Sequence, residues 1–152
     1  MTKADDCVVA WRSLLLAHSG AVRAIEADLA AAATIPLSWY DVLLELNAAP
    51  GRRLRMQDLA ARVLLSRTRV SRLVDEIVQA GLIERIADPD DGRATFAVLT
   101  TKGRGELRKT APRYLDGIER HFTSLFTAKE QAQLTSLLQR VADRHAGLRS
   151  AR

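Results

Sequence analysis

The segment "LRMQDLAARVLLSRTRVSRLVDEIVQAG", residues 54–81, constrains the fold more than any other part of the chain. Its apolar residues recur at helical spacing on both sides of "LLS", a join that is too short for anything but a tight turn. We expect a short helix from about Gln57 to Val63, then a second helix that Ser66 caps and Gly81 closes. The sequence therefore predicts two helices joined by a tight turn.

A hairpin is predicted directly after this pair of helices. The runs "LIERI" and "TFAVLT" are short and rich in branched and aromatic residues, as strands are. Between them lies "ADPDDGRA", whose Pro89 and Gly92 are typical of a turn. Two short helices followed at once by a two-stranded hairpin form the order of a winged helix-turn-helix, in which the second helix enters the major groove of DNA.

Longer helices flank this central region. The first carries a heptad-like apolar stripe, and so long a stripe at one end of a small chain predicts that part of it faces a second copy of the protein; burial in the chain's own core is the alternative. The stripe consists of Val8, Trp11, Leu15, His18, Val22, Ile25 and Leu29.

Three further helices complete the prediction, which is a mainly α-helical fold with a small β-hairpin wing. One is expected from about Trp39 to Ala48, with Ser38 as its N-cap. Another is expected from about Lys102 to Leu125. The last follows "TAKE", Thr127 to Glu130, which has the pattern of a capping box.

Composition narrows the class of protein. The 152 residues fit one domain, and no phosphate-binding glycine loop, HExxH sequence or nucleophile elbow indicates an enzyme or a cofactor. A net charge of +5 favours an anionic partner. Because the chain has neither a leader pattern nor an apolar run of about 20 residues, we expect it to be cytoplasmic, without a membrane partner. The single cysteine, Cys7, fits a reducing compartment.

The expected second helix of the pair has one basic face and one apolar face. Val70, Leu73, Val74 and Ile77 recur at the spacing of a buried side. The opposite side offers donors for guanine edges and phosphates, although a merely solvated basic face is the alternative. The residues of that side in the first two turns are Arg67, Thr68, Ser71 and Arg72.

The chain resembles the multiple-antibiotic-resistance regulator (MarR) family of bacterial winged-helix transcription factors. The resemblance is carried by "LSWYDVLLEL", by residues 54–85 and above all by "DPDDGRATFAVLTTKG". It implies a single domain of residues 1–152, with a winged region of about 37–101 and dimerisation helices of about 5–32 and 103–148. It further implies a homodimer that reads a near-palindromic operator, usually as a repressor.

The resemblance also implies DNA-contacting residues. Arg93 would reach into a minor groove, where negative potential is concentrated, and Asp91 would orient its guanidinium through a charge-assisted hydrogen bond. Gly92 stands where many relatives have another arginine, and Met56 where relatives often have Ser or Thr. Whether Asp88 and Asp90 only solvate the turn or keep it from gripping random DNA is left open. The full predicted set is Gln57, Ser66, Arg67, Thr68, Arg69, Ser71, Arg72, Asp91 and Arg93.

Relatives commonly bind small, often anionic aromatic effectors. Candidate contacts here are Trp11, His18, Trp39 and Tyr40, with ordinary core packing as the alternative. Redox sensing by Cys7 and zinc sensing by that cysteine with the histidines are further alternatives, and no pair has the close spacing typical of a metal site. An architectural DNA binder without sequence preference, or a winged domain used for protein contacts, also remains open.

Overall fold

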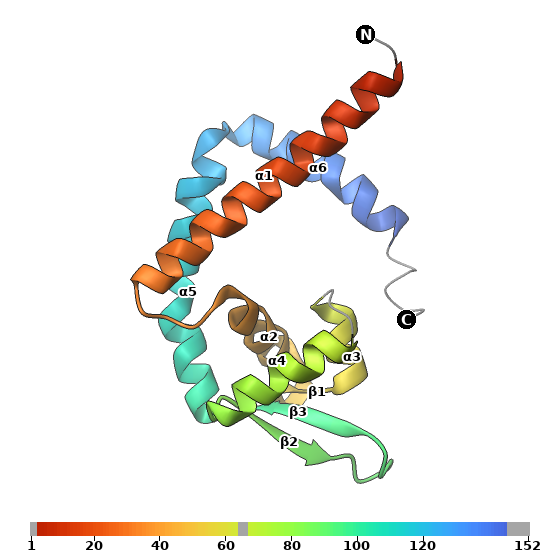
Figure 1. Cartoon of the computed structure of the whole chain (residues 1–152), viewed down its shortest axis with the longest axis vertical. Coiled ribbons are helices and arrows are strands. Elements are labelled where there is room, and N and C mark those ends of the chain that lie inside the picture. Colours follow the sequence, from red (N-terminus) through yellow and green to blue (C-terminus); the bar gives the residue numbers. More distant parts are fainter. Residues whose placement is uncertain (1–2, 64–66, 146–152) are drawn as a thin grey trace.

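The protein is described from a computed structural model, over residues 3–63 and 67–145. A winged-helix lobe lies at one end; two long helices extend from it, and a third helix follows at their far end (Figure 1). The elements of the lobe are α2 (Leu37–Ala48), a 3-10 turn (Pro50–Arg52), β1 (Arg53–Arg55), α3 (Met56–Arg62), α4 (Arg67–Gln79), β2 (Ile83–Ala87) and β3 (Thr95–Leu99). The arms are α1 (Lys3–Ala31), α5 (Thr101–His121), a 3-10 turn (Thr123–Leu125) and α6 (Ala128–Arg144).

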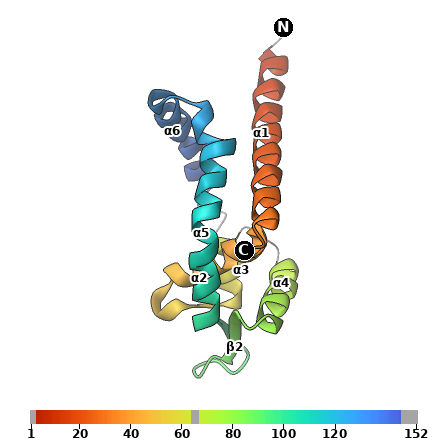
Figure 2. The same ribbon diagram turned by 90° about the vertical axis from the view of Figure 1, so that its left-hand side faces the viewer.

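Helices α1 and α5 rise from the lobe side by side, and α6 folds back at the far end (Figure 2). Gly117 lets the two long helices approach, because a Cβ at this position would lie 3.2 Å from Cγ1 of Ile25. A polar contact adds to this packing. Asp28 of α1 accepts hydrogen bonds from Arg120 Nη1 at 3.2 Å and from His121 Nε2 at 2.8 Å.

The predicted buried face of α4 is confirmed. Val70, Val74 and Ile77 are fully buried in the lobe, and Leu73 is partly buried against the core. The predicted closing glycine is also confirmed, since Gly81 has a φ of 75° and ends the helix in a Schellman motif. In that motif the Leu82 amide donates to the Ile77 carbonyl at 3.1 Å, and the Gly81 amide donates to the Val78 carbonyl at 2.8 Å.

The hairpin of β2 and β3 is confirmed, but the sheet has a third strand that the sequence did not predict. The strand order is β1-β3-β2, all antiparallel, with Arg55 opposite Phe96 and Ile86 on the other side of Phe96. Strand β1 has only three residues, "RLR", which is too short for an alternating pattern to identify it. It lies directly before α3 and ties the helix pair to the wing.

Two predicted helix starts have different outcomes. The N-cap role of Ser38 is wrong: α2 begins at Leu37, two residues before the expected start at Trp39, with Pro36 at the capping position and no side-chain cap. The Pro36 carbonyl accepts the first helical hydrogen bonds, from the Trp39 and Tyr40 amides at 3.0 Å each. The capping box of Thr127 and Glu130 is confirmed, because each side chain bonds the other residue's backbone amide.

The junction between the lobe and α5 is tight. Thr100 caps α5 by accepting a hydrogen bond from the Gly103 amide, and its hydroxyl donates to the Gly81 carbonyl at 2.8 Å. A Cβ at Gly103 would lie 2.2 Å from the Leu82 carbonyl oxygen, so only glycine fits this position. The expected helix over residues 102–125 is therefore anchored at its start, and it ends at His121.

Candidate nucleic-acid interface

An open cleft of about 410 Å³ lies between the helix pair and the wing. Four of the predicted DNA-contacting residues line it, namely Gln57, Ser71, Asp91 and Arg93. Two arginines that the sequence reasoning did not single out, Arg55 and Arg85, line it as well; Met56, Ala94 and Thr95 complete the lining. The cleft thus brings together residues of β1, α3, α4 and the wing.

The outward side of α4 borders this cleft. Arg69 and Arg72 are exposed there, opposite the buried face of the helix. Arg67 and Thr68 belong to the first turn of α4, but their side chains are outside the described part of the structure, and so is Ser66. A basic outer side on an otherwise buried helix is what contact with phosphates and base edges requires.

Arg85 fastens β2 to α4. Its Nη2 atom lies 2.8 Å from Asp75 Oδ1 and donates to both the carbonyl oxygen and the hydroxyl of Ser71, at 3.2 and 3.3 Å. Ser71, predicted to face DNA, is therefore already engaged within the chain. Alternation along β2 places Arg85 on the same face of the sheet as Ile83, toward the helices, and this alternation is a signal that could have identified it.

The wing tip carries Arg93, which is exposed as predicted. The predicted bond between Asp91 and the Arg93 guanidinium is wrong. Asp91 Oδ1 instead accepts a hydrogen bond from the Arg93 backbone amide at 3.1 Å. The short aspartate side chain reaches the backbone amide two residues later and forms an Asx turn. The bond therefore fixes the backbone of Arg93 and not its guanidinium.

Asp88 does more than solvate the acidic turn. It is only 3% exposed, and its carboxylate pairs with Nη2 of Arg55 on β1. Its other oxygen, Oδ1, accepts a hydrogen bond from the Asp90 amide at 2.9 Å. This amide and the Arg55 cation hold the pKa of Asp88 below its ordinary value, against the opposing effect of burial. Asp90 itself is exposed.

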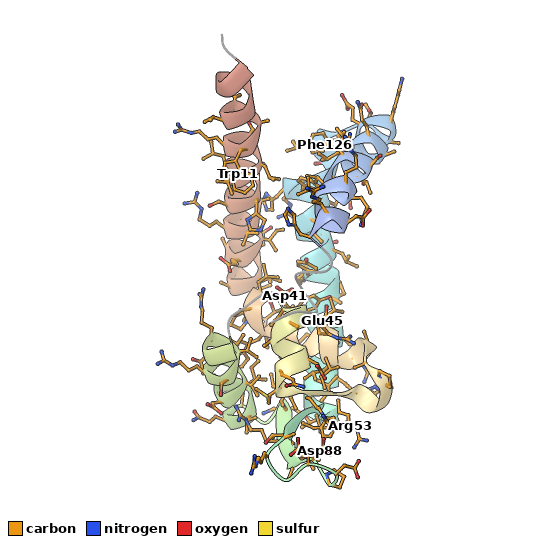
Figure 3. The ribbon with its side chains drawn as sticks, turned by 90° about the vertical axis from the view of Figure 1, so that its right-hand side faces the viewer. Trp11, Asp41, Glu45, Arg53, Asp88 and Phe126 are labelled. Carbon is orange, nitrogen blue, oxygen red and sulfur yellow. The ribbon has the colours of Figure 1, made fainter. Side chains whose placement is uncertain are left out.

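Arg55 is held from a second side. Its guanidinium carbon lies 5.8 Å from the centre of the Phe96 ring, and that of Arg53 lies 4.8 Å from the same ring. Both arginines and the ring belong to the outer face of the sheet, as the register requires. Arg53 and Asp88 both lie at the lobe end of the molecule (Figure 3).

Helix α3 begins at Met56 without a side-chain cap, and Arg55 occupies the capping position. Gln57, one of the predicted DNA-contacting residues, is exposed in the first turn of α3 and lines the cleft.

The four candidate effector residues are not brought together in this chain. Tyr40 is buried and packs on Tyr114, with ring centres 4.8 Å apart, while Trp39 is partly buried against the core. Trp11 is 60% exposed high on α1, about 30 Å along the helix axis from the end of α1, and His18 is also exposed (Figure 3). Burial raises the pKa of both tyrosines above the ordinary value.

Nothing in the described side chains forms a metal site. Within residues 8–63 and 69–145, whose side chains the structure describes, no three His, Cys, Asp or Glu residues are placed to hold a metal ion. His121, one of the histidines considered, instead bonds Asp28. The side chain of Cys7 lies outside the described part.

No helix in the described part of the chain is both long and apolar enough to cross a membrane.

The helix pair, the three-stranded wing and the basic cleft between them are the parts of a winged helix-turn-helix protein. Comparison with known proteins agrees. A model of the MarR family matches residues 33–94. The crystal structure of AbsC, a MarR family transcriptional regulator from Streptomyces coelicolor, is 31% identical and covers 97% of both chains with a TM-score of 0.84.

Two further relatives extend the comparison. Sco3205, a MarR family transcriptional regulator from Streptomyces coelicolor crystallised in complex with DNA, is 31% identical, with a TM-score of 0.84, over 94% of this chain and 89% of its own. YkoM of Bacillus subtilis, an HTH-type transcriptional regulator, is 35% identical over 64% of this chain and 62% of its own length. The match therefore spans less than two thirds of that curated relative. The chain belongs to the MarR family, whose members are transcriptional regulators and not enzymes.

Proposed function

We propose that this protein is a sequence-specific transcriptional regulator that binds a near-palindromic operator as a homodimer and represses a neighbouring gene. The observation that carries the proposal is the cleft in which Gln57, Ser71 and Arg93 come together beside the outward arginines of α4. Donors from a helix and from a wing then face the same side of the lobe. Such a surface suits a major groove and the adjacent minor groove. The likeness to Sco3205 in complex with DNA supports the proposal.

The homodimer is proposed from the arms. Apolar side chains are exposed along the outer half of α1 and along α6, and two copies that cover each other's arms would bury them. In such a dimer the two α4 helices would present themselves to two half-sites of the operator, related by a two-fold axis.

Release by a small, often anionic aromatic effector is part of the same proposal. Trp39 and the contacting rings of Tyr40 and Tyr114 lie where α2 meets α5, the connection between lobe and arms. Trp11 and His18 belong to the exposed part of α1, so a contact between them and the same molecule would require the partner subunit. A ligand at that connection could change the angle between lobe and arm and hence the spacing of the two α4 helices.

The test is selection of bound fragments from genomic DNA with the purified protein, followed by titration of one selected fragment against random DNA of equal length at fixed salt. We expect an affinity ratio of about 10³ or more. A ratio near one would identify an architectural binder instead, and no salt-dependent binding at all would indicate a domain for protein contacts.

A further inference from the structure

The wing tip is held by hydrogen bonds that start at Asp88. The Asp88 amide donates to the Ala94 carbonyl at 2.9 Å and closes the hairpin, while its Oδ1 atom receives the Asp90 amide. Asp91 then closes the second half of the tip, since its carbonyl oxygen accepts from the Ala94 amide at 2.8 Å and its side chain from the Arg93 amide. The backbone of Arg93 is thus fixed by two successive turns.

These turns are anchored to the rest of the lobe through Arg55. The ion pair of Arg55 with Asp88 joins the wing tip to β1, which runs directly into α3. The Asp88 side chain is 1% exposed and that of Arg55 37%, so the carboxylate is enclosed while the cation reaches it from the cleft side. The face of Phe96 limits where this guanidinium can lie.

We propose that Arg55 and Asp88 are positioning residues for DNA recognition: their ion pair holds the wing tip so that Arg93 meets the minor groove while α4 occupies the major groove. The inference rests on the proposed function, because it assigns a role within the same interface. Neither residue needs to touch DNA. Because the ion pair orders the tip before DNA binds, binding does not have to supply the free energy of ordering it, and the affinity is higher.

A matched pair of variants separates positioning from the loss of positive charge. Arg53→Met and Arg55→Met each remove one cation from β1, and both guanidiniums lie over Phe96, but only Arg55 is tied to Asp88. We expect Arg55→Met to weaken binding to a selected operator about tenfold more than Arg53→Met does, a difference equal to one orienting charge-assisted bond. Binding to random DNA should fall equally in both. Equal losses on the operator would overturn the proposal.

In a second variant, the proposal and bulk electrostatics predict opposite changes in DNA affinity. Asp88→Asn makes the protein more positive by one charge, which by itself would strengthen binding to DNA. The asparagine side chain can still accept the Asp90 amide, so the turn is preserved and only the pairing with Arg55 is weakened. We expect weaker operator binding in spite of the added charge. Unchanged or tighter operator binding would overturn the proposal.

A double-mutant cycle tests whether the pair acts through Arg93. Arg93→Ala should weaken operator binding strongly in the wild-type background and much less in the Asp88→Asn background, because a displaced arginine has less contact to lose. Additive losses would overturn the proposal. Thermal unfolding of each variant provides the folding control.

Hydrogen exchange provides a readout without DNA. The Arg93 and Ala94 amides, which both bond to Asp91, should exchange faster in Arg55→Met and at the wild-type rate in Arg53→Met. Unchanged exchange in Arg55→Met would overturn the positioning role even if the protein binds its operator. Failure of the wild-type protein to select any DNA would instead contradict the proposed function, so the two failures are distinguishable.

Discussion

The winged-helix lobe and the helical arms differ in how far they bury their apolar side chains. In the lobe, α4 buries Val70, Val74 and Ile77 completely, and among its described large apolar residues only Leu44 and Ile86 are exposed. The arms expose many more along α1, α5, the 3-10 turn of residues 123–125 and α6: Val8, Val9, Trp11, Leu14, Leu15, Leu16, Leu115, Leu125, Leu137, Leu138 and Val141.

This difference separates a lobe with its own buried core from arms whose exposed apolar side chains form the proposed dimer surface. Burial of an apolar stripe is what stabilises most helices in water, but residues 8–20 of α1 are all exposed in this chain. Full burial on α1 is reached at Ile25, where Gly117 admits α5. The lobe therefore carries its own core and the candidate DNA-contacting residues, whereas the arms supply the surface that the proposed homodimer needs.

The largest expected effect is that of a charge placed in the proposed dimer interface on α1. Leu15→Asp places a charge in the exposed apolar stripe, and an uncompensated charge buried between two subunits costs about 3 kcal/mol or more, which is about a 100-fold rise in the dimer dissociation constant. Ser13→Asp adds the same charge on the opposite side of the helix and should leave the dimer intact. Sedimentation equilibrium measures both constants; dimers of equal strength would contradict the assignment of this stripe.

The next effect concerns the junction between the two regions. Gly103→Ala forces a methyl group against the Leu82 carbonyl and should destabilise the protein by about 1–3 kcal/mol or more. Gly105→Ala lies in the same helix, where an added Cβ meets nothing within 4 Å, and should stabilise the helix by about 0.5–1 kcal/mol. Urea unfolding of the two variants measures these changes. Similar stabilities would contradict a tight junction at Gly103.

A smaller effect tests whether the lobe's wing faces DNA. A Cβ at Gly92 meets nothing within 4 Å, and the residue is outside the left-handed region, so a side chain fits there without strain. Gly92→Arg should tighten DNA binding severalfold and steepen the dependence of log affinity on log salt by about 0.9, the value for one more neutralised phosphate. Gly92→Ala should change neither quantity. An unchanged slope in the arginine variant would place the wing tip away from the phosphates.

The smallest effect is a pH dependence within the lobe. Because the folded state lowers the pKa of Asp88, its ionised carboxylate stabilises the protein above the unfolded value of about 3.9, and this contribution is lost as pH falls through the folded pKa. Asp88→Asn should therefore be less stable than the wild type near neutral pH and lose less stability in acid. Asp90→Asn, at an exposed carboxylate, should follow the wild type. Thermal unfolding between neutral pH and about pH 3 compares the three proteins.

Features that depend on local spacing could be predicted from the sequence. The buried face of α4, the closing Gly81 and the capping box of Thr127 and Glu130 all follow from residues within one or two helical turns of each other. The hairpin and the exposure of Arg93 at its tip follow from turn chemistry in the same way.

Contacts between distant segments could not be predicted. Arg55 and Asp88 are far apart in the chain and meet only because β1 joins the hairpin as a third strand. A strand of three residues is too short for its sequence pattern to predict it. The clasp of Arg85 on Ser71 and Asp75 depends likewise on the tertiary packing of β2 against α4. At the tip, chain order indicated that Asp91 serves Arg93, but not that the bond is to its backbone amide.

The most direct test of the account is the binding of the protein to a selected operator and to the same operator with one half-site scrambled. Native mass spectrometry would give the stoichiometry, and titration the affinities. We predict two chains per operator and a loss of about 100-fold or more when one half-site is scrambled, because each mismatched base pair costs about 1–3 kcal/mol. Equal affinity for the two fragments, or one chain per operator, would contradict it.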